Sequence, residues 1–147
     1  MADTTFAQGT RSSAVLALGT LASATYVTSS AIDLGASIPF DVVFEVEANA
    51  NGTPSGNKQL VLFCKCSLDN SNYGSGPESG TTATEEADLH YVGALPTVDT
   101  NDHRKFFSLR DAGVPITRYL KLVAKNDLGV ALTSGSVYQA NITATTA

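Results

Sequence analysis

The sequence predicts an all-β fold, an antiparallel β-sandwich or barrel of about eight or nine short strands. Short apolar runs alternate with polar residues at a period of two, which is typical of strands. Gly, Pro, Asn and Ser separate these runs, and no stretch has a sustained helical period. The chain has 147 residues, of which 43% are hydrophobic. This is enough apolar surface for one domain with a single core.

The N-terminal part of the chain is expected to hold an arm and the first strands. Residues 1–13 are predicted to form a polar arm, and residues 14–147 a single β-sandwich domain. The apolar run at residues 14–18 predicts the first strand of that domain. Residues 26–34 predict one or two further strands.

Two strands in the middle of the chain are expected to differ in their exposed faces. Residues 41–48 alternate between apolar residues and glutamates, which predicts a strand with one solvated face. Residues 58–67 are largely apolar on both faces, which predicts a central strand of a sheet. The turn residues within segment 49–57 predict a hairpin connection between the two strands.

The second half of the chain predicts a long loop, four more strands and an unanchored tail. Residues 69–88 are rich in Ser, Gly and Thr, and a loop of this length is typically functional, mobile or ordered by a partner. Phe106 and Phe107 are expected on opposite faces of their strand. The tail, residues 143–147, has little to anchor it. The four strands are expected at residues 89–95, 105–109, 118–126 and 136–143.

The charge of the chain excludes several classes of partner. Nine Lys and Arg face fourteen Asp and Glu, which gives a net charge of -5. Nucleic acids and anionic membranes attract basic surfaces, so we expect neither as a partner. The apolar run after Arg11 imitates a signal peptide, but Asp3 offsets the charge of Arg11 and Gly19 interrupts the run. We therefore expect no cleavage there.

The sequence contains no motif for nucleophilic catalysis, phosphate binding or dinucleotide binding. Cys64 and Cys66 lie on one strand face, too far apart for an easy disulfide, and are expected to act as small hydrophobic residues. A zinc site needs four ligands, and only His90 and His103 could join the cysteines. We expect a non-enzymatic protein without metal or cofactor. A cleft that joined both histidines to a carboxylate would favour an enzyme instead.

Five residues are candidates for contact with a partner. Phe6 and Arg11 lie in the arm, where an apolar anchor and a charge can become ordered on binding. Tyr73 is the aromatic residue of the long loop. His103 and Arg104 begin a concentration of positive charge in the C-terminal half. This charge is either scattered over strand ends or forms a patch for an acidic partner or a neighbouring copy.

Three segments together resemble a known family. They are YVTSSAIDLG (26–35) with PFDV (39–42), GNKQLVL (56–62) leading to SLDNSNY (67–73), and RYLKLV (118–123) with KNDLG (125–129). Their arrangement resembles small virion structural proteins of tailed bacteriophages, some of which are head decoration, or cement, proteins. The resemblance covers residues 24–143, and its motifs are structural rather than catalytic.

The resemblance implies a jelly-roll-like β-sandwich that binds the major capsid protein, with no catalytic residues and no cofactor. It implies a homo-oligomer, a trimer or a dimer, placed on the capsid surface of the virion after synthesis in the host cytoplasm. The expected function is to bind the outer surface of the phage head and stabilise it. The strand at residues 118–126 also resembles one in carbohydrate-binding sandwiches. The alternative is therefore a tail-associated or head-fibre module that recognises host-surface carbohydrate, although the chain has no Trp for stacking on sugars.

Overall fold

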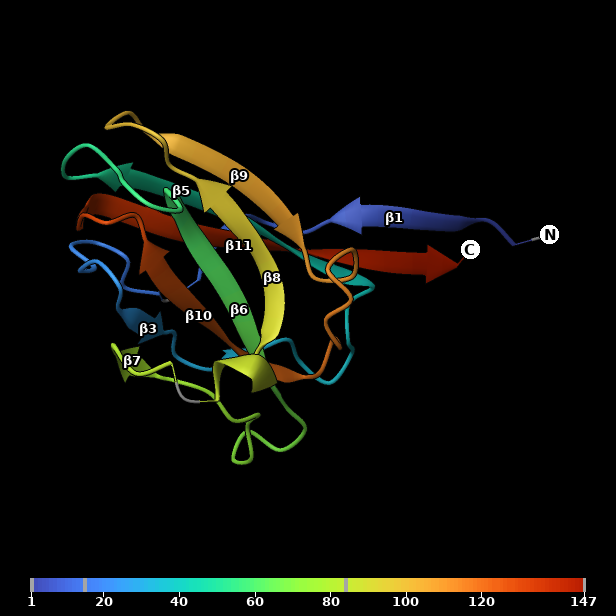
Figure 1. Cartoon of the computed structure of the whole chain (residues 1–147). Coiled ribbons are helices and arrows are strands. Elements are labelled where there is room, and N and C mark those ends of the chain that lie inside the picture. The colour runs from blue at the N-terminus through green and yellow to red at the C-terminus, as the bar shows by residue number, and fades with distance from the viewer. Residues whose placement is uncertain (1, 15, 84, 147) are drawn as a thin grey trace.

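Two antiparallel sheets pack face to face in the computed structural model, which describes residues 2–14, 16–83 and 85–146 (Figure 1). The described residues form eleven strands and one turn of 3-10 helix, η1 (Glu86–Asp88). Three strands have only two residues each. The predicted all-β sandwich is confirmed, whereas its jelly-roll connectivity stays a prediction.

The first sheet has the order β1-β11-β5-β9, and β2 also pairs with β11. Its strands are β1 (Thr4–Gln8), β2 (Ser12–Ser13), β5 (Asp41–Ala50), β9 (His103–Ser108) and β11 (Leu132–Thr146). The second sheet has the order β7-β3-β10-β6-β8, and β4 also pairs with β10. Its strands are β3 (Tyr26–Thr28), β4 (Ile32–Asp33), β6 (Gln59–Ser67), β7 (Ser79–Gly80), β8 (His90–Pro96) and β10 (Tyr119–Asp127).

The core lies between the two sheets and follows the predicted alternation. Val42, Phe44 and Val46 of β5 point inward and are buried, and Glu45 and Glu47 lie on the opposite, partly exposed face. Phe107 is buried, whereas Phe106 is 62% exposed, so these two residues lie on opposite faces as predicted. β6 pairs with β10 on one side and with β8 on the other, which confirms that it is a central strand.

The long loop covers the outer face of the second sheet. A second apolar cluster lies there, formed by Tyr26, Val61, Phe63, Leu89 and Val123. Beside it, the buried Lys65 donates from Nζ to the carbonyl oxygen of Gly76 at 2.8 Å, and Lys65 Nζ lies 3.3 Å from Glu78 Oε1. Contacts within the chain therefore hold this loop against the sheet.

Residues 14–18 do not form the predicted strand, and Val15 lies outside the described residues. Leu16 N–H donates to the Ala14 carbonyl at 2.8 Å, and Leu18 N–H donates to the Leu16 carbonyl at 3.1 Å. These bonds between residues two apart are those of tight turns. Ala14, Leu16 and Leu18 are nevertheless buried in the core. The period of two correctly indicated which of these side chains are buried. The backbone, however, forms tight turns here instead of the expected pairing with a neighbouring strand.

The connection at residues 49–57 is not a hairpin, because β5 and β6 lie in different sheets. The segment crosses from one layer of the sandwich to the other. Asn51 N–H donates to the Ala131 carbonyl at 2.9 Å, and Ser55 N–H donates to the Leu128 carbonyl at 2.8 Å. The crossing is thus fixed along the turn between β10 and β11.

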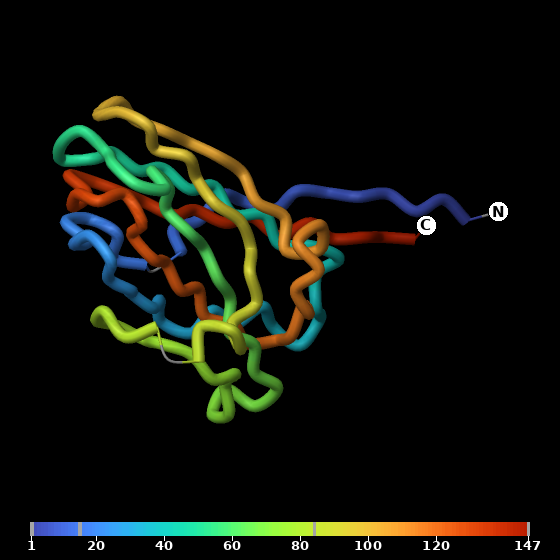
Figure 2. Tube along the Cα trace, in the orientation of Figure 1, coloured from blue at the N-terminus to red at the C-terminus, as the bar shows by residue number. Residues whose placement is uncertain are grey.

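The N-terminal arm and the C-terminal tail anchor each other. β1 pairs antiparallel with the end of β11, from Thr4 opposite Thr146 to Gln8 opposite Ile142. Residues 143–146 are therefore part of a strand, contrary to the prediction of an unanchored tail. β5 begins opposite Ile142, so residues 143–146 and the β1 residues paired with them extend past it; β1 and residues 142–146 are called the ribbon here. Figure 2 shows the ribbon projecting from the body, with both termini at its tip.

Candidate partner-binding surface

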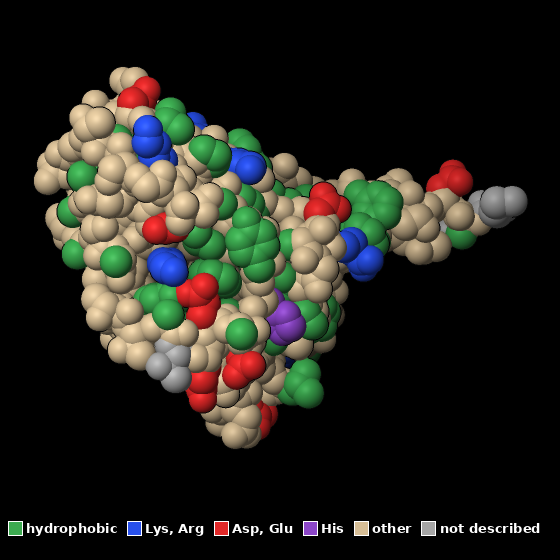
Figure 3. Space-filling view, viewed as in Figure 1, with side chains coloured by type: hydrophobic (Ala, Val, Ile, Leu, Met, Phe, Trp, Pro, Cys, Tyr) green, Lys and Arg blue, Asp and Glu red, His purple; other side chains and the backbone are tan. Residues whose placement is uncertain are grey.

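Large apolar side chains are exposed where the ribbon leaves the body of the sandwich. Phe6 of β1 is 57% exposed, and Phe40, which precedes β5, is 37% exposed. The centroids of their rings lie 4.9 Å apart. Figure 3 shows hydrophobic and basic side chains gathered at the base of the projection. This end of the molecule therefore presents aromatic surface to solvent.

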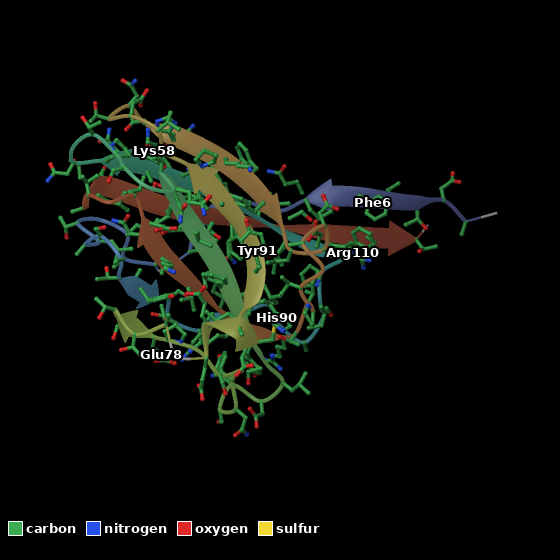
Figure 4. All side chains as sticks on the ribbon, in the orientation of Figure 1. Phe6, Lys58, Glu78, His90, Tyr91 and Arg110 are labelled. Carbon is green, nitrogen blue, oxygen red and sulfur yellow. The ribbon has the colours of Figure 1, made fainter. Side chains whose placement is uncertain are left out.

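Arg110 completes this group, and Phe6, Phe40 and Arg110 are called the end cluster here; Figure 4 labels Phe6 and Arg110. The guanidinium carbon of Arg110 lies 3.8 Å from the centroid of the Phe40 ring, which is cation–π geometry. Arg110 Nε also donates to the Phe40 carbonyl at 3.0 Å. The buried carboxylate of Asp41 accepts the Arg110 backbone N–H at 3.0 Å and the hydroxyl of Ser108. The position of Arg110 is thus fixed by the first residue of β5.

A shallow groove of about 450 Å³ adjoins the end cluster. Ile38 lies on one side and is 44% exposed. The lining residues are Ile38, Pro39, Phe40, Arg110, Gly113, Val114, Pro115 and Ile116. The end cluster and this groove form one continuous region, lined mainly by apolar residues, with exposed backbone groups and a single guanidinium group on it.

A free cysteine lies next to this groove. Cys66 Sγ is 3.3 Å from the carbonyl oxygen of Pro115, one of the lining residues. Its pKa is lowered to about 7, because the Cys64 thiol hydrogen-bonds to it, and the same interaction raises the pKa of the buried Cys64. Neither cysteine forms a disulfide.

Two of the predicted contact residues, Arg11 and Arg104, lie in a charge network on the exposed face of the first sheet. Arg11 donates from Nε and Nη2 to the Glu45 carboxylate at 2.9 and 3.1 Å, and its guanidinium lies 3.5 Å from the centroid of the Tyr138 ring. Arg104 lies 3.4 Å from Glu45 and donates to Glu47. The hydrogen bond from Arg11 lowers the pKa of Glu45. Both arginines are therefore already paired within the chain.

The other two predicted residues lie away from the end cluster. His103 begins β9, at the opposite end of that strand from Ser108, and its Nε2 lies 2.8 Å from Asp99 Oδ1. Tyr73 donates its hydroxyl proton to Asn70 Oδ1 at 2.7 Å, beside the second sheet. Of the five predicted contact residues, only Phe6 belongs to the end cluster.

Ile38, Phe40 and Arg110 were not predicted as contact residues. Ile38 and Phe40 flank Pro39, just before the alternating run of β5. These two apolar residues lie outside the alternating pattern, and that was the one feature of the sequence that could have indicated exposed contact residues. Arg110 belongs to the concentration of positive charge in the C-terminal half, for which the sequence left both scattered charge and a patch open. No pattern in the sequence connects residue 110 with residues 6 and 40, because topology alone brings them together.

The described residues contain no group of three or more His, Cys, Asp and Glu arranged to hold a metal ion. His90 is exposed at the start of β8, and His103 starts β9 near the other end of the molecule, so the two histidines do not share a cleft. Within the same part of the chain, no helix has the length and apolar character needed to cross a membrane. Comparison of the chain with protein-family models and with curated proteins gave no match.

Proposed function

We propose that this chain is a structural virion protein that binds the outer surface of a phage head through the major capsid protein and stabilises it without catalysis. The resemblance of the three segments supports a protein of this class. The end cluster and its groove carry the proposal, because they expose Phe6, Ile38 and Phe40 together on an acidic protein. Exposed apolar surface of this kind is typical of sites that bind other proteins.

The order of the strands supports the jelly-roll part of the proposal. We count β1 with β2 and β3 with β4 as single interrupted strands and leave out the short β7. The first sheet then holds the first, eighth, third and sixth strands, and the second sheet holds the second, seventh, fourth and fifth. We infer that this is jelly-roll connectivity, in which paired strands fold over into two sheets.

A decoration role also fits the small size of the exposed region. Each copy would bind a repeating capsid lattice, and multiple contacts add avidity to a modest affinity per copy. Arg110 supplies one charge to the region and is held over Phe40, so it can meet an acidic group of the capsid without first becoming ordered.

Co-sedimentation with undecorated capsids of the parent phage tests the proposal. The unmodified chain should saturate at about one copy per major capsid protein. Ile38→Ser should weaken binding about tenfold, as expected for an apolar contact residue of an interface. Val98→Ser is the matched control, because Val98 is 55% exposed and lies outside the groove, in the connection between β8 and β9. It should leave binding unchanged.

Two other results would contradict the decoration role. Binding at only a few copies per particle would indicate a vertex, portal or tail position. Absence of binding at all concentrations would exclude the capsid as the partner. Equal losses for both variants would exclude the groove as the contact surface, since they would reflect exposed apolar area in general.

The carbohydrate-binding alternative has one observation in its favour. Phe106 is 62% exposed beside a hollow of about 100 Å³ that also contains Gln8 and Glu45. An exposed ring next to polar groups is an arrangement suited to sugars. The second ring at this hollow, Tyr138, is covered by Arg11, which leaves Phe106 as the accessible platform. Glycan binding by calorimetry that is lost in Phe106→Ser would favour this function.

A further inference from the structure

The main strand orders of the two sheets end in four strands, β1, β9, β7 and β8, and the last three carry features that prevent pairing with other chains. β7 has only two residues. β8 ends in Pro96, and its pairing with β6 shifts register between Leu62 and Phe63. β9 presents the charged side chains of Arg104 and Lys105. Short edges, prolines, irregular register and charges are the usual protections of an exposed edge.

The fourth edge, β1, has none of these protections. Its sequence is Thr-Thr-Phe-Ala-Gln, without charge or proline, and all five residues are exposed. Its register with β11 is regular from end to end. Two-stranded ribbons are marginally stable in water unless a further strand or a packed layer supports them. The edge of β1 is thus open to the addition of another strand.

The hydrogen-bonding direction of β1 follows from one contact. Gly9 N–H donates to the Asn141 carbonyl at 2.8 Å, in the same register as the rest of β1. Backbone groups alternate sides along an antiparallel strand, so those of Thr5 and Ala7 also face β11. The N–H and C=O groups of Thr4, Phe6 and Gln8 consequently face outward, to a side on which no described strand pairs with β1.

We propose that this edge of β1 pairs with β1 of a second copy, antiparallel and centred on Phe6. With the two Phe6 residues opposite each other, Thr4 of each copy lies opposite Gln8 of the other. Every outward N–H and C=O then meets its complement, which gives about six backbone hydrogen bonds across a two-fold axis. The two ribbons become one four-stranded sheet.

The chemistry of the edge favours a second copy as the occupant. Each chain carries a net charge of -5, yet residues 4–8 are uncharged, so two copies meet there without like-charge repulsion. The pairing places the two Phe6 side chains directly across from each other on one face, as a cross-strand aromatic pair. Because Phe6 contacts Phe40, the end clusters of both copies come together on that face.

The opposite edge of the ribbon has fewer backbone groups free to pair with another strand. Residues 143–146 lie beyond the start of β5, and the same alternation leaves only Ala144 and Thr146 with outward backbone groups there.

The pairing through β1 goes beyond the proposed function. It concerns the purified chain alone, so it can hold or fail whatever the capsid binds.

Cysteine cross-linking of the full chain tests the register. Opposed residues of a hydrogen-bonded pair have Cα atoms about 5.5 Å apart, within the roughly 4.4–6.8 Å that a disulfide spans. Phe6→Cys, treated with copper phenanthroline, should therefore give mainly a disulfide-linked dimer. Ala7→Cys is the matched control, since Ala7 would lie opposite Thr5 of the other copy and on the other face. Both variants keep the two native cysteines.

Charge substitution in analytical ultracentrifugation supplies a second test that needs no disulfide. Phe6→Lys and Phe6→Glu should each weaken dimerisation, because like charges lie opposite each other. An equimolar mixture should bind about fivefold more tightly than either variant alone, because the pair then has opposite charges.

Three results would overturn the proposal. They are a monomeric unmodified chain up to the highest soluble concentration, equal cross-linking of the two cysteine variants, and a trimer. A chain that is monomeric alone but has a protected ribbon on capsids would assign this edge to a capsid strand instead.

Discussion

β5 and β1 lie in the same sheet, and both pair antiparallel with β11, but they differ in what they bury. Half of the β5 side chains lie in the core, and Val42, Phe44 and Val46 are at most 1% exposed. All residues of β1 are exposed. Backbone hydrogen bonds add little net stability in water, so burial decides which strand holds the fold together. The body thus provides stability, and the ribbon provides surface for contacts outside the chain.

The largest expected effect separates two phenylalanines of this sheet. Phe44→Ala removes a ring that is 1% exposed and should lower the free energy of unfolding by about 4 kcal/mol. Phe6→Ala removes a ring that is 57% exposed and should lower it by about 0.5 kcal/mol or less in the monomer. Urea unfolding at low protein concentration measures both. Similar losses for the two variants would show that the ribbon contributes to the stability of the body.

The second largest expected loss of stability comes from removing a buried side-chain amide, and it extends the comparison of buried and exposed residues to polar groups. Asn126 is fully buried, and its Nδ2 donates to the carbonyls of Leu21 and Val130 at 2.8 and 2.9 Å. Its Oδ1 accepts the Leu128 N–H at 2.9 Å. Asn126→Ala leaves these buried groups unpaired and should cost about 2 kcal/mol of unfolding free energy.

The matched control is Asn57→Ala, which removes an exposed amide with one side-chain hydrogen bond and should cost about 0.5 kcal/mol or less. Thermal unfolding of both variants provides the measurement. If the Asn57 variant lost as much as the Asn126 variant, burial would not account for the difference between buried and exposed polar groups.

Alternation in the sequence predicts strands well where one face meets the core and the other meets water. The runs predicted at residues 41–48 and 118–126 lie within β5 and β10, with the expected faces inward. The same signal fails at residues 14–18, where Ala14, Leu16 and Leu18 are buried but Leu16 and Leu18 donate to carbonyls two residues back instead of to a neighbouring strand. Periodicity reports where side chains point, and it does not report what the backbone pairs with.

Side-chain periodicity could not predict the ribbon or the end cluster. Neither β1 nor residues 143–146 buries a face, so neither has a pattern, and their pairing joins Thr4 to Thr146 across almost the whole chain. Phe6 was predicted as an apolar anchor from its place in the arm. Its neighbour Phe40 and the guanidinium of Arg110 come from distant segments, so only the fold reveals that the three form one surface.

The smallest effect concerns the ion pair at the junction between ribbon and body. Arg11 lies between β1 and β2, and Glu45 belongs to β5, so their paired hydrogen bonds connect the base of the ribbon to the sheet. The hydrogen bond from Arg11 lowers the pKa of Glu45 in the folded chain. A carboxyl group whose folded pKa is lowered stabilises the fold above its unfolded pKa, which is about 4.3. That stabilisation is lost as the pH falls through the folded value.

We therefore expect Glu45→Gln to lower the melting temperature slightly at pH 7, and to lower it progressively less as the pH falls below about 4.3 and through the lowered folded pKa, where the wild-type carboxylate also becomes neutral. Arg11→Gln should show the same dependence on pH, and the double variant should lose no more than either single variant, since one interaction is removed in all three. Salt should reduce the effect at pH 7, because the pair is exposed. Additive losses in the double variant would mean that Arg11 acts through Tyr138 and the ribbon base instead of through Glu45, and would place the connection between ribbon and body on β11.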